Sequence, residues 1–155
     1  MVKQAIIDLL GPQSYQGDTL HAHYIAQKIF EDKALLQKMN ALVHPEVGKD
    51  FEQWRAAQTA PYVIKEAAIL FENGSYKSCD FMIVVIAPIA TRIERVVKRD
   101  KTTEEAVIQR IKSQWNDAKK VALSDVYIEN VFLDETQKTV LRVHKHLLLK
   151  IKKGW

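Results

Sequence analysis

The sequence has little of what a secreted or membrane-spanning protein requires. It contains a single cysteine, Cys79, so no disulfide can form within the chain, and nothing indicates an oxidising compartment. Its longest apolar run, residues 81–90, is too short to cross a bilayer. Residues 1–10 lack the charged-then-apolar pattern of a signal peptide. We therefore expect a cytoplasmic protein.

The chain also lacks a strong excess of either charge. Its 23 Lys and Arg residues against 19 Asp and Glu give a net charge of +4, spread along 155 residues. The one local basic run, Lys150 with Lys152 and Lys153, is typical of a solvated helix end. The balance suits a small anionic ligand and gives no reason to expect nucleic acid or a membrane as partner. An apolar content of 47% is enough for the core of one domain.

The first half of the sequence predicts helices separated by turns. An opening helix is expected over residues 2–10, a second beginning near Thr19, and a third over residues 35–43. The pair His44-Pro45 predicts a boundary, because proline disfavours helix in the residue before it and fits the first position of a new helix. A fourth helix, from Pro45 onward, is expected to bury three side chains: Val47, Phe51 and Trp54.

The second half predicts strands that alternate with helices. Strands are predicted over three ranges: residues 62–70, 81–87 and 126–130. Helices are predicted over residues 88–99, 103–117 and 136–152, with Thr102 and Glu105 as a capping box for the second. The uncharged strand 81–87 is expected to be buried on both faces of a parallel sheet. This order predicts an α/β fold that binds ligands at the carboxyl ends of its strands.

Arginines are arranged regularly in this half of the chain. Arg92, Arg95 and Arg99 fall on one face of a predicted helix, and Arg110 and Gln114 lie one turn apart in the next. Guanidinium groups match phosphate oxygens, and phosphoryl transfer needs positive charge around the moving group. The alternative is a solvated face of surface ion pairs. The acidic partners would then be Glu94, Asp100 and Glu104.

Six sequence elements carry a family resemblance. In chain order they are His44-Pro45, Ile69-Leu70-Phe71-Glu72, Asp80 with the strand up to Pro88, Arg92-Ile93-Glu94-Arg95 with Arg99-Asp100, Arg110-Ile111 with Gln114, and Asp125 to Asn130. Their order and spacing resemble the dephospho-CoA kinase family, in particular its Bacteroidetes branch, from about Leu9 onward. The resemblance implies a P-loop kinase-like three-layer α/β fold with a parallel sheet. It divides the chain into a helical CoA-binding part (about 1–60), a core (about 61–99 and 121–155) and a lid (about 100–120).

The resemblance also implies an activity and a set of site residues. The enzyme would use ATP with Mg²⁺ to phosphorylate the 3′-hydroxyl of dephospho-CoA. Arg110 would stabilise the charge of the transferred group, and Glu72 would hold a magnesium-bound water. The other ATP-binding residues would be Arg95, Arg99, Gln114 and Asn130, the last near the adenine. His44 would contact dephospho-CoA. A simple ion pair for Glu72 and a plain helix cap for His44 are the alternatives.

The sequence departs from the family pattern at its beginning. The G-x-x-x-x-G-K-[ST] loop, the strand before it and the strand with the catalytic Asp do not occur in these 155 residues. Gly48-Lys49 is no such loop, because Asp50 follows it. We therefore expect a kinase domain truncated at its N-terminus, inactive by itself and prone to self-association through an exposed sheet edge. A non-enzymatic CoA-binding, nucleotide-binding or protein-interaction module and another P-loop nucleotide kinase are the alternatives.

Overall fold

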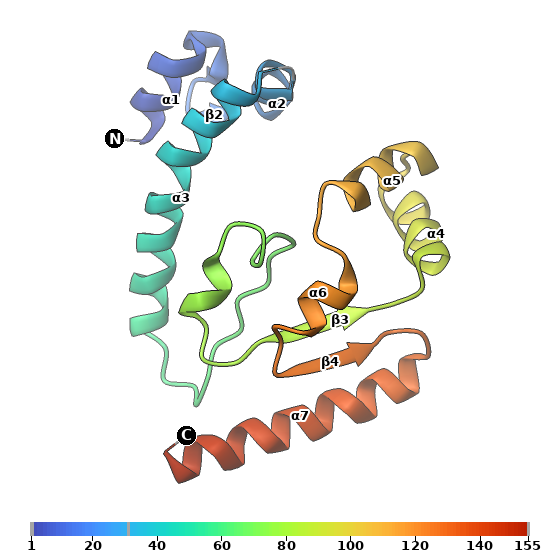
Figure 1. Ribbon diagram of the computed structural model, residues 1–155. Coiled ribbons are helices and arrows are strands. Elements are labelled where there is room, and N and C mark those ends of the chain that lie inside the picture. Colours follow the sequence, from blue (N-terminus) through green and yellow to red (C-terminus); the bar gives the residue numbers. More distant parts are fainter. Residues whose placement is uncertain (1, 31, 155) are drawn as a thin grey trace. The chain divides into compact units, whose positions relative to one another are not determined.

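The computed structural model describes residues 2–30 and 32–154 (Figure 1). The chain forms two compact units, Met1–Val63 and Ile64–Trp155. The first unit is mainly helical, and the second contains a parallel sheet with helices. Each unit has a cluster of buried apolar side chains of its own.

Three helices and a short hairpin make up the first unit. Its elements are α1 (Val2–Leu10), the 3₁₀ turn η1 (Pro12–Ser14), β1 (Tyr15–Gln16), β2 (Thr19–Leu20), α2 (Ala22–Phe30) and α3 (Lys33–Ala56). The core side chains are Ile6, Leu10, Ile25 and Met39. The predicted opening helix is confirmed. The second helix begins at Ala22 and not near Thr19, because Gly17, with a φ of 62°, turns the chain back into an antiparallel hairpin.

Helix α3 runs through Pro45 without a break, so the predicted boundary at His44-Pro45 is wrong. A proline inside a helix removes one hydrogen bond and crowds the preceding turn, at a cost of about 3 kcal/mol. A helix cap and a core contact in the N-terminal half of α3 offset this cost. The Asp32 carboxylate caps the helix by accepting hydrogen bonds from the N–H groups of Ala34 and Leu35, at 2.8 and 3.0 Å. Met39 anchors the same half in the core.

The half of α3 after Pro45 is more exposed than the sequence predicts. Val47 is 59% exposed and Trp54 48%, so their predicted burial is wrong. Phe51 is half-buried, and its ring lies 5.7 Å from that of Trp54. The apolar spacing of this half is that of a packed helix, but within the first unit the core lies against its other half. Helical periodicity alone does not predict which turns of a helix will pack against another element.

The second unit is built on two parallel strands, β3 (Ile83–Ile86) and β4 (Val126–Glu129). They pair in register from Ile83 opposite Val126 to Ile86 opposite Glu129. The other elements are the 3₁₀ turn η2 (Ser75–Ser78), α4 (Ile89–Asp100), α5 (Glu104–Lys112), α6 (Asp117–Val121) and α7 (Leu133–Lys153). Both strands and the order of helices confirm the predicted α/β fold. The region predicted as one helix over 103–117 is divided, because the Asn116 side chain caps a new helix by accepting from Lys119 N–H.

The predicted capping box is also displaced by one residue. Thr103, and not Thr102, caps α5, and its hydroxyl accepts from the Ala106 N–H at 3.3 Å. Lys101 before it ends α4 with a φ of 51°. The left-handed residue reverses the chain, so α5 turns back against α4. This reversal positions the side chains of the candidate site.

Strand β3 is covered on one face only, which corrects the expectation of burial on both. Val84 is 7% exposed and packs with Leu70, Phe71 and Met82, whereas Val85, on the opposite face, is 59% exposed. On that opposite face α7 runs along β4 (Figure 1). A strand is buried on both faces only where helices cover both.

No strand forms where the sequence predicts one over residues 62–70. Residues 62–67 have no regular structure, and residues 68–73 form turns. Ile64 is 73% exposed, while Leu70 and Phe71 are buried against β3. A strand requires a neighbour for its backbone hydrogen bonds, and none in the described part of the chain pairs with this segment. Glu72 therefore lies in a turn and not at the end of a strand.

Candidate functional site

The carboxyl ends of β3 and β4 lead directly into the regions that the sequence marks as functional. After β3 the chain enters α4, which carries the three spaced arginines, and after β4 it reaches Asn130. The Asn130 N–H donates to the Ile86 carbonyl at 2.8 Å, so the two strand ends are joined. This is the edge at which α/β sheets bind ligands.

Asp100 brings Arg99 and Arg110 together at the turn between α4 and α5. Its carboxylate accepts hydrogen bonds from Arg99 at 2.7 and 3.2 Å and forms an ion pair with Arg110 at 3.5 Å. Both arginine side chains are mostly exposed, at 72% and 58%, whereas Asp100 is 31% exposed. Arg99 and then Arg110 hold the pKa of Asp100 below its ordinary value, and Asp100 in turn raises the pKa of Arg99. Two guanidinium groups therefore lie together on a solvent-accessible surface.

Arg95 lies one turn before Arg99 and has a different contact. Its guanidinium donates to the backbone carbonyls of Asn130 and Val131, at 2.6 and 3.1 Å. The structure thus brings together two predicted site residues, Arg95 and Asn130, that are 35 positions apart. In this arrangement Arg95 holds the loop after β4. The Thr136 hydroxyl lies 3.4 Å from Asn130 Oδ1 and contributes to the same loop.

Arg92 connects α4 to α6. Its guanidinium donates to both carboxylate oxygens of Asp117, at 3.3 and 2.9 Å, and both side chains are about one-third exposed. Its Nε is buried and has no partner among the described residues. A bidentate pair of this kind fixes the relative position of two helices. Asp117 could not be identified from spacing, because it is 25 positions from Arg92.

Glu72 is enclosed in a largely buried ion pair. Its Oε1 lies 3.0 Å from Lys120 Nζ and accepts from the Trp115 N–H at 2.7 Å. The side chains of Glu72 and Lys120 are only 16% and 12% exposed. Burial opposes ionisation of Glu72, but the backbone N–H groups of Trp115 and Glu72 and the Lys120 ammonium together hold its pKa below the ordinary value. The contact fixes the residues just after α5, including the half-buried Gln114.

His44 lies apart from these residues in the chain. It is an exposed residue in the middle of α3, in the first unit, while the other six predicted site residues belong to the second. Its predicted contact with dephospho-CoA stays a prediction.

The carboxylates of the site are already matched with cations. Asp100 faces two arginines, Asp117 faces Arg92, and Glu72 faces Lys120. Within the described ranges, no three His, Cys, Asp or Glu side chains gather as a metal site. These residues do not by themselves fit a Mg²⁺ ion, which takes oxygen ligands and is repelled by adjacent ammonium and guanidinium groups. A metal ion here would depend on oxygen ligands from elsewhere.

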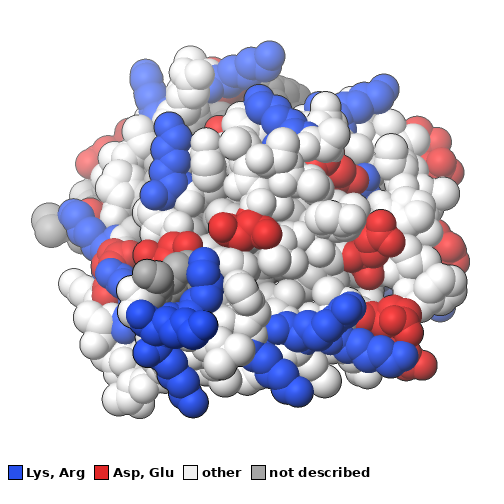
Figure 2. Space-filling view, turned by 60° about the horizontal axis from the view of Figure 1, so that its bottom comes forward, with Lys and Arg blue, Asp and Glu red and all other residues white. Residues whose placement is uncertain are grey.

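The face of the molecule drawn in Figure 2 is mixed in charge. Figure 2 shows Lys and Arg side chains in separate groups, with Asp and Glu between several of them. Such a surface differs from the continuous basic face of a protein that tracks a nucleic-acid backbone. Among the described helices, none combines the length and apolar character that a bilayer-crossing segment needs.

Known proteins of one family match most of this chain. The family model for CoaE, dephospho-CoA kinase, matches residues 2–135. A dephospho-CoA kinase of Porphyromonas gingivalis is 40% identical over 114 residues, which cover 74% of this chain and 56% of the relative. One from Bacteroides fragilis is 31% identical over 131 residues, covering 84% and 64%. The chain thus spans a little over half to under two thirds of the length of these relatives.

A solved structure extends the comparison to three dimensions. The crystal structure of TT1252 from Thermus thermophilus superposes with a TM-score of 0.84 at 26% sequence identity, over 93% of this chain and 75% of the other. The likeness confirms the predicted fold, and the family match includes the sheet, the arginine helices and Asn130. The chain belongs to the dephospho-CoA kinase family.

Proposed function

We propose that this chain serves the ATP-dependent phosphorylation of the 3′-hydroxyl of dephospho-CoA, which yields coenzyme A in the cytoplasm. The observation that carries the proposal is the pair of guanidinium groups on Asp100, at the end of α4, the helix that follows β3, in a chain that belongs to this family. Phosphoryl transfer requires concentrated positive charge of this kind. Its two substrates would be ATP and dephospho-CoA.

Arg99 and Arg110 would bind the phosphates of ATP by exchanging one anionic partner for another. In the free protein Asp100 keeps the two guanidinium groups close and oriented. A polyphosphate carries more charge and more oxygen acceptors than one carboxylate, so it can replace Asp100 as their partner. Arg110 would then stabilise the charge that develops on the transferred group.

Arg95 and Asn130 would form the adenine side of the site. The two hydrogen bonds from Arg95 fix the backbone of residues 130 and 131, and Thr136 lies beside the Asn130 amide. A side-chain amide held this way can recognise the edge of a base through its donor and acceptor. Gln114 would face the nucleotide from the end of α5.

Glu72 would hold the residues just after α5 in position. Mg²⁺ would reach the site together with ATP. The contact of Glu72 with Lys120 and the Trp115 N–H supports the ion-pair alternative for this residue. Mg²⁺ commonly keeps waters and phosphate oxygens as most of its ligands, so it can reach the site bound to the nucleotide. The first unit, with His44 on α3, would hold dephospho-CoA.

A second function, nucleotide binding without phosphoryl transfer, is favoured by one specific observation. The 155 residues contain no G-x-x-x-x-G-K-[ST] loop, whose backbone N–H groups and lysine hold the phosphates in this class of kinase. We therefore expect this chain to bind nucleotide weakly and to transfer no phosphate when it is assayed alone.

Binding and transfer can be separated experimentally. Titration of the chain with a fluorescent ATP analogue should show saturable binding that Arg110→Ala weakens about tenfold, as expected for the loss of a charged hydrogen-bonding partner. Arg142→Ala, which removes an exposed arginine of α7, is the matched control and should have no effect. Binding of dephospho-CoA and phosphoryl transfer to it are measured in parallel. If neither nucleotide nor dephospho-CoA binds, both proposed functions are wrong, and if transfer occurs, the binding-only function is wrong.

A further inference from the structure

Arg92 is the one arginine of the regular series on α4 that has no part in the proposed function. Its side chain is 30% exposed, against 72% for Arg99. Both terminal nitrogens of its guanidinium donate to the carboxylate of Asp117, at 3.3 and 2.9 Å, and its Nε is buried. A guanidinium engaged in this way has no second fork of donors for a phosphate. Arg92 therefore differs from Arg99 and lies outside the phosphate-binding surface.

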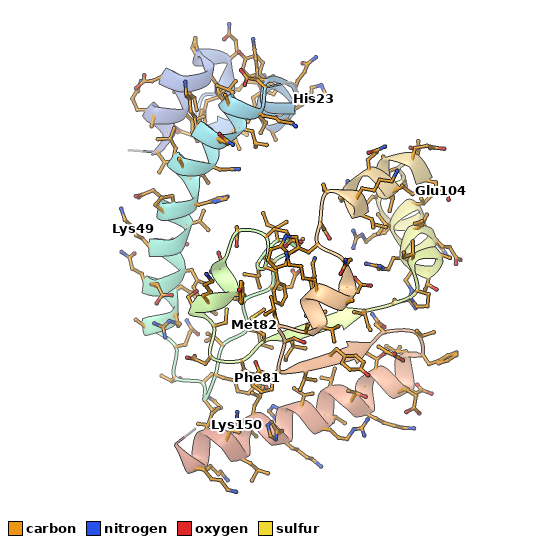
Figure 3. The ribbon with its side chains drawn as sticks, in the orientation of Figure 1. His23, Lys49, Phe81, Met82, Glu104 and Lys150 are labelled. Atoms are coloured by element: carbon orange, nitrogen blue, oxygen red, sulfur yellow. The ribbon has the colours of Figure 1, made fainter. Side chains whose placement is uncertain are left out.

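The ion pair of Arg92 with Asp117 closes the base of the helical hairpin that α4 and α5 form. Arg92 lies near the start of α4, and Asp117 is the first residue of α6. The pair therefore joins the two ends of the segment that contains α5 and the turn at Asp100. Figure 3 shows Glu104, the first residue of α5, at the end of this hairpin that is remote from α6. The pair holds the base of the hairpin and leaves its tip accessible.

The two arginines of the proposed phosphate site lie at equal sequence distances from this pair. Arg99 follows Arg92 by seven residues, on the same face of one helix. Arg110 precedes Asp117 by seven residues. Seven residues of helix measure about 10 Å, so a tilt of α4 by about 10° at Arg92 would move Arg99 by about 2 Å. That displacement is larger than the range of about 0.5 Å within which a hydrogen bond keeps its strength.

A second contact anchors the base of the hairpin to the core of the second unit. The Trp115 N–H, two positions before Asp117, donates to the Glu72 carboxylate at 2.7 Å. The Trp115 side chain packs against the buried cluster that includes Phe71. The chain that returns from α5 is thus fixed to the core, and the start of α4 is fixed to that chain through Asp117.

We propose that Arg92 and Asp117 are positioning residues for the two phosphate-binding arginines. The pair sets the direction in which α4 presents Arg99, and it fixes the chain that returns from Arg110. Neither member of the pair contacts the phosphate. This inference rests on the proposed function, because it assigns Arg99 and Arg110 to the phosphates of ATP.

The sign of one substitution separates positioning from an effect of charge alone. Asp117→Asn removes a negative charge, so charge alone predicts tighter binding of inorganic triphosphate. Loss of the pair predicts binding about fivefold weaker, as for residues coupled in one ion-pair network. Arg92→Lys keeps the positive charge but not the two parallel hydrogen bonds, and it should also weaken binding. Glu94→Gln is the matched control, since it removes the same charge from an exposed position of α4, and it should not weaken binding.

Amide hydrogen exchange tests the restraint on the hairpin without any ligand. In Asp117→Asn, exchange should become faster across α4 and α5 and stay unchanged in β3 and β4, whereas a general loss of stability would raise it in all four. Triphosphate affinity is measured by calorimetry on the same samples, well below their unfolding temperatures.

The outcomes distinguish a failure of this inference from a failure of the proposed function. If the original chain binds triphosphate and Asp117→Asn binds it equally or more tightly, the positioning role is wrong and the proposed function stands. Exchange that rises equally in the helices and the strands of Asp117→Asn also overturns the positioning role. If the original chain binds no triphosphate, the phosphate site of the proposed function is wrong, and the positioning role is wrong with it.

Discussion

Asp100 and Arg110 form an ion pair across the turn from α4 to α5, with 3.5 Å between the carboxylate Oδ2 and the guanidinium Nη1. The same carboxylate holds Arg99 at 2.7 Å. Asp100 is therefore an internal competitor of any phosphate that the two arginines bind. At the same time it keeps two like charges close together in the free protein.

The first prediction concerns this competition. Asp100→Asn removes the negative charge that partly neutralises Arg99 and Arg110, so we expect inorganic triphosphate to bind several-fold more tightly. The gain should shrink as salt is raised, because the groups are exposed and screened. Calorimetric titration at two salt concentrations measures both effects. Weaker triphosphate binding by the variant would show that orientation of the arginines outweighs competition.

The second prediction concerns Lys120 and its neighbour Lys119. Lys120→Met leaves the Glu72 carboxylate largely buried without its cation, so the free energy of unfolding should fall by about 3 kcal/mol. Lys119 is exposed and lies over the Trp115 ring, 3.3 Å from its centre, so Lys119→Met should cost less than about 1 kcal/mol. Urea denaturation provides both values. Equal losses in the two variants would contradict a specific role for the buried pair.

The third prediction is a dependence of stability on pH. The pKa of Glu72 in the folded chain is below its ordinary value of 4.5. Its contribution is therefore fully present above that value and is lost as pH falls through the folded pKa. Glu72→Gln should flatten the loss of stability below about pH 4.5 and leave the curve above pH 6 parallel to that of the original chain. Thermal unfolding across this range, with Glu135→Gln as an exposed control, tests it.

The sequence predicts local structure well and long-range contacts poorly. The strands 83–86 and 126–129 and the arginine helix follow from patterns within a few residues of one another. The partners of Glu72 do not, since Trp115 lies 43 positions away and Lys120 further still. Spacing suggested Asp100 only as a surface partner, because the turn that brings Arg110 to it depends on the left-handed Lys101.

The wrong predictions share one physical cause. No described segment pairs with, or packs over, the residues concerned. Residues 62–67 have the composition of a strand but no partner strand among the described residues, and Val85 has the composition of a buried position but no helix over it. The hydrophobic pattern of a segment shows which of its side chains are suited to burial. Whether burial occurs is decided by other parts of the chain.

The fourth prediction concerns Arg95. Arg95→Ala removes two hydrogen bonds to the carbonyls of Asn130 and Val131, so the loop after β4 should open more often. We expect faster amide hydrogen exchange at residues 130–132 and a loss of about 1 kcal/mol in stability, since Arg95 is exposed. Adenosine binding should weaken together with triphosphate binding if this loop recognises the base. Unchanged exchange in the loop would show that the two hydrogen bonds do not restrain it.

The last prediction separates stability from function at Pro45. Replacing Pro45 with Ala restores a backbone N–H in the interior of α3, so the first unit should become more stable by about 1 to 3 kcal/mol. Pro45 leaves one backbone carbonyl of the preceding turn without its helical hydrogen bond, beside His44, the residue that we expect to contact dephospho-CoA. Pro45→Ala should therefore raise the unfolding temperature and weaken dephospho-CoA binding, whereas Gly48→Ala, also within α3, should raise the temperature and leave binding unchanged. Equal dephospho-CoA affinity in both variants would leave Pro45 without a role in substrate binding, and the His44-Pro45 pair would then be a feature of α3 alone.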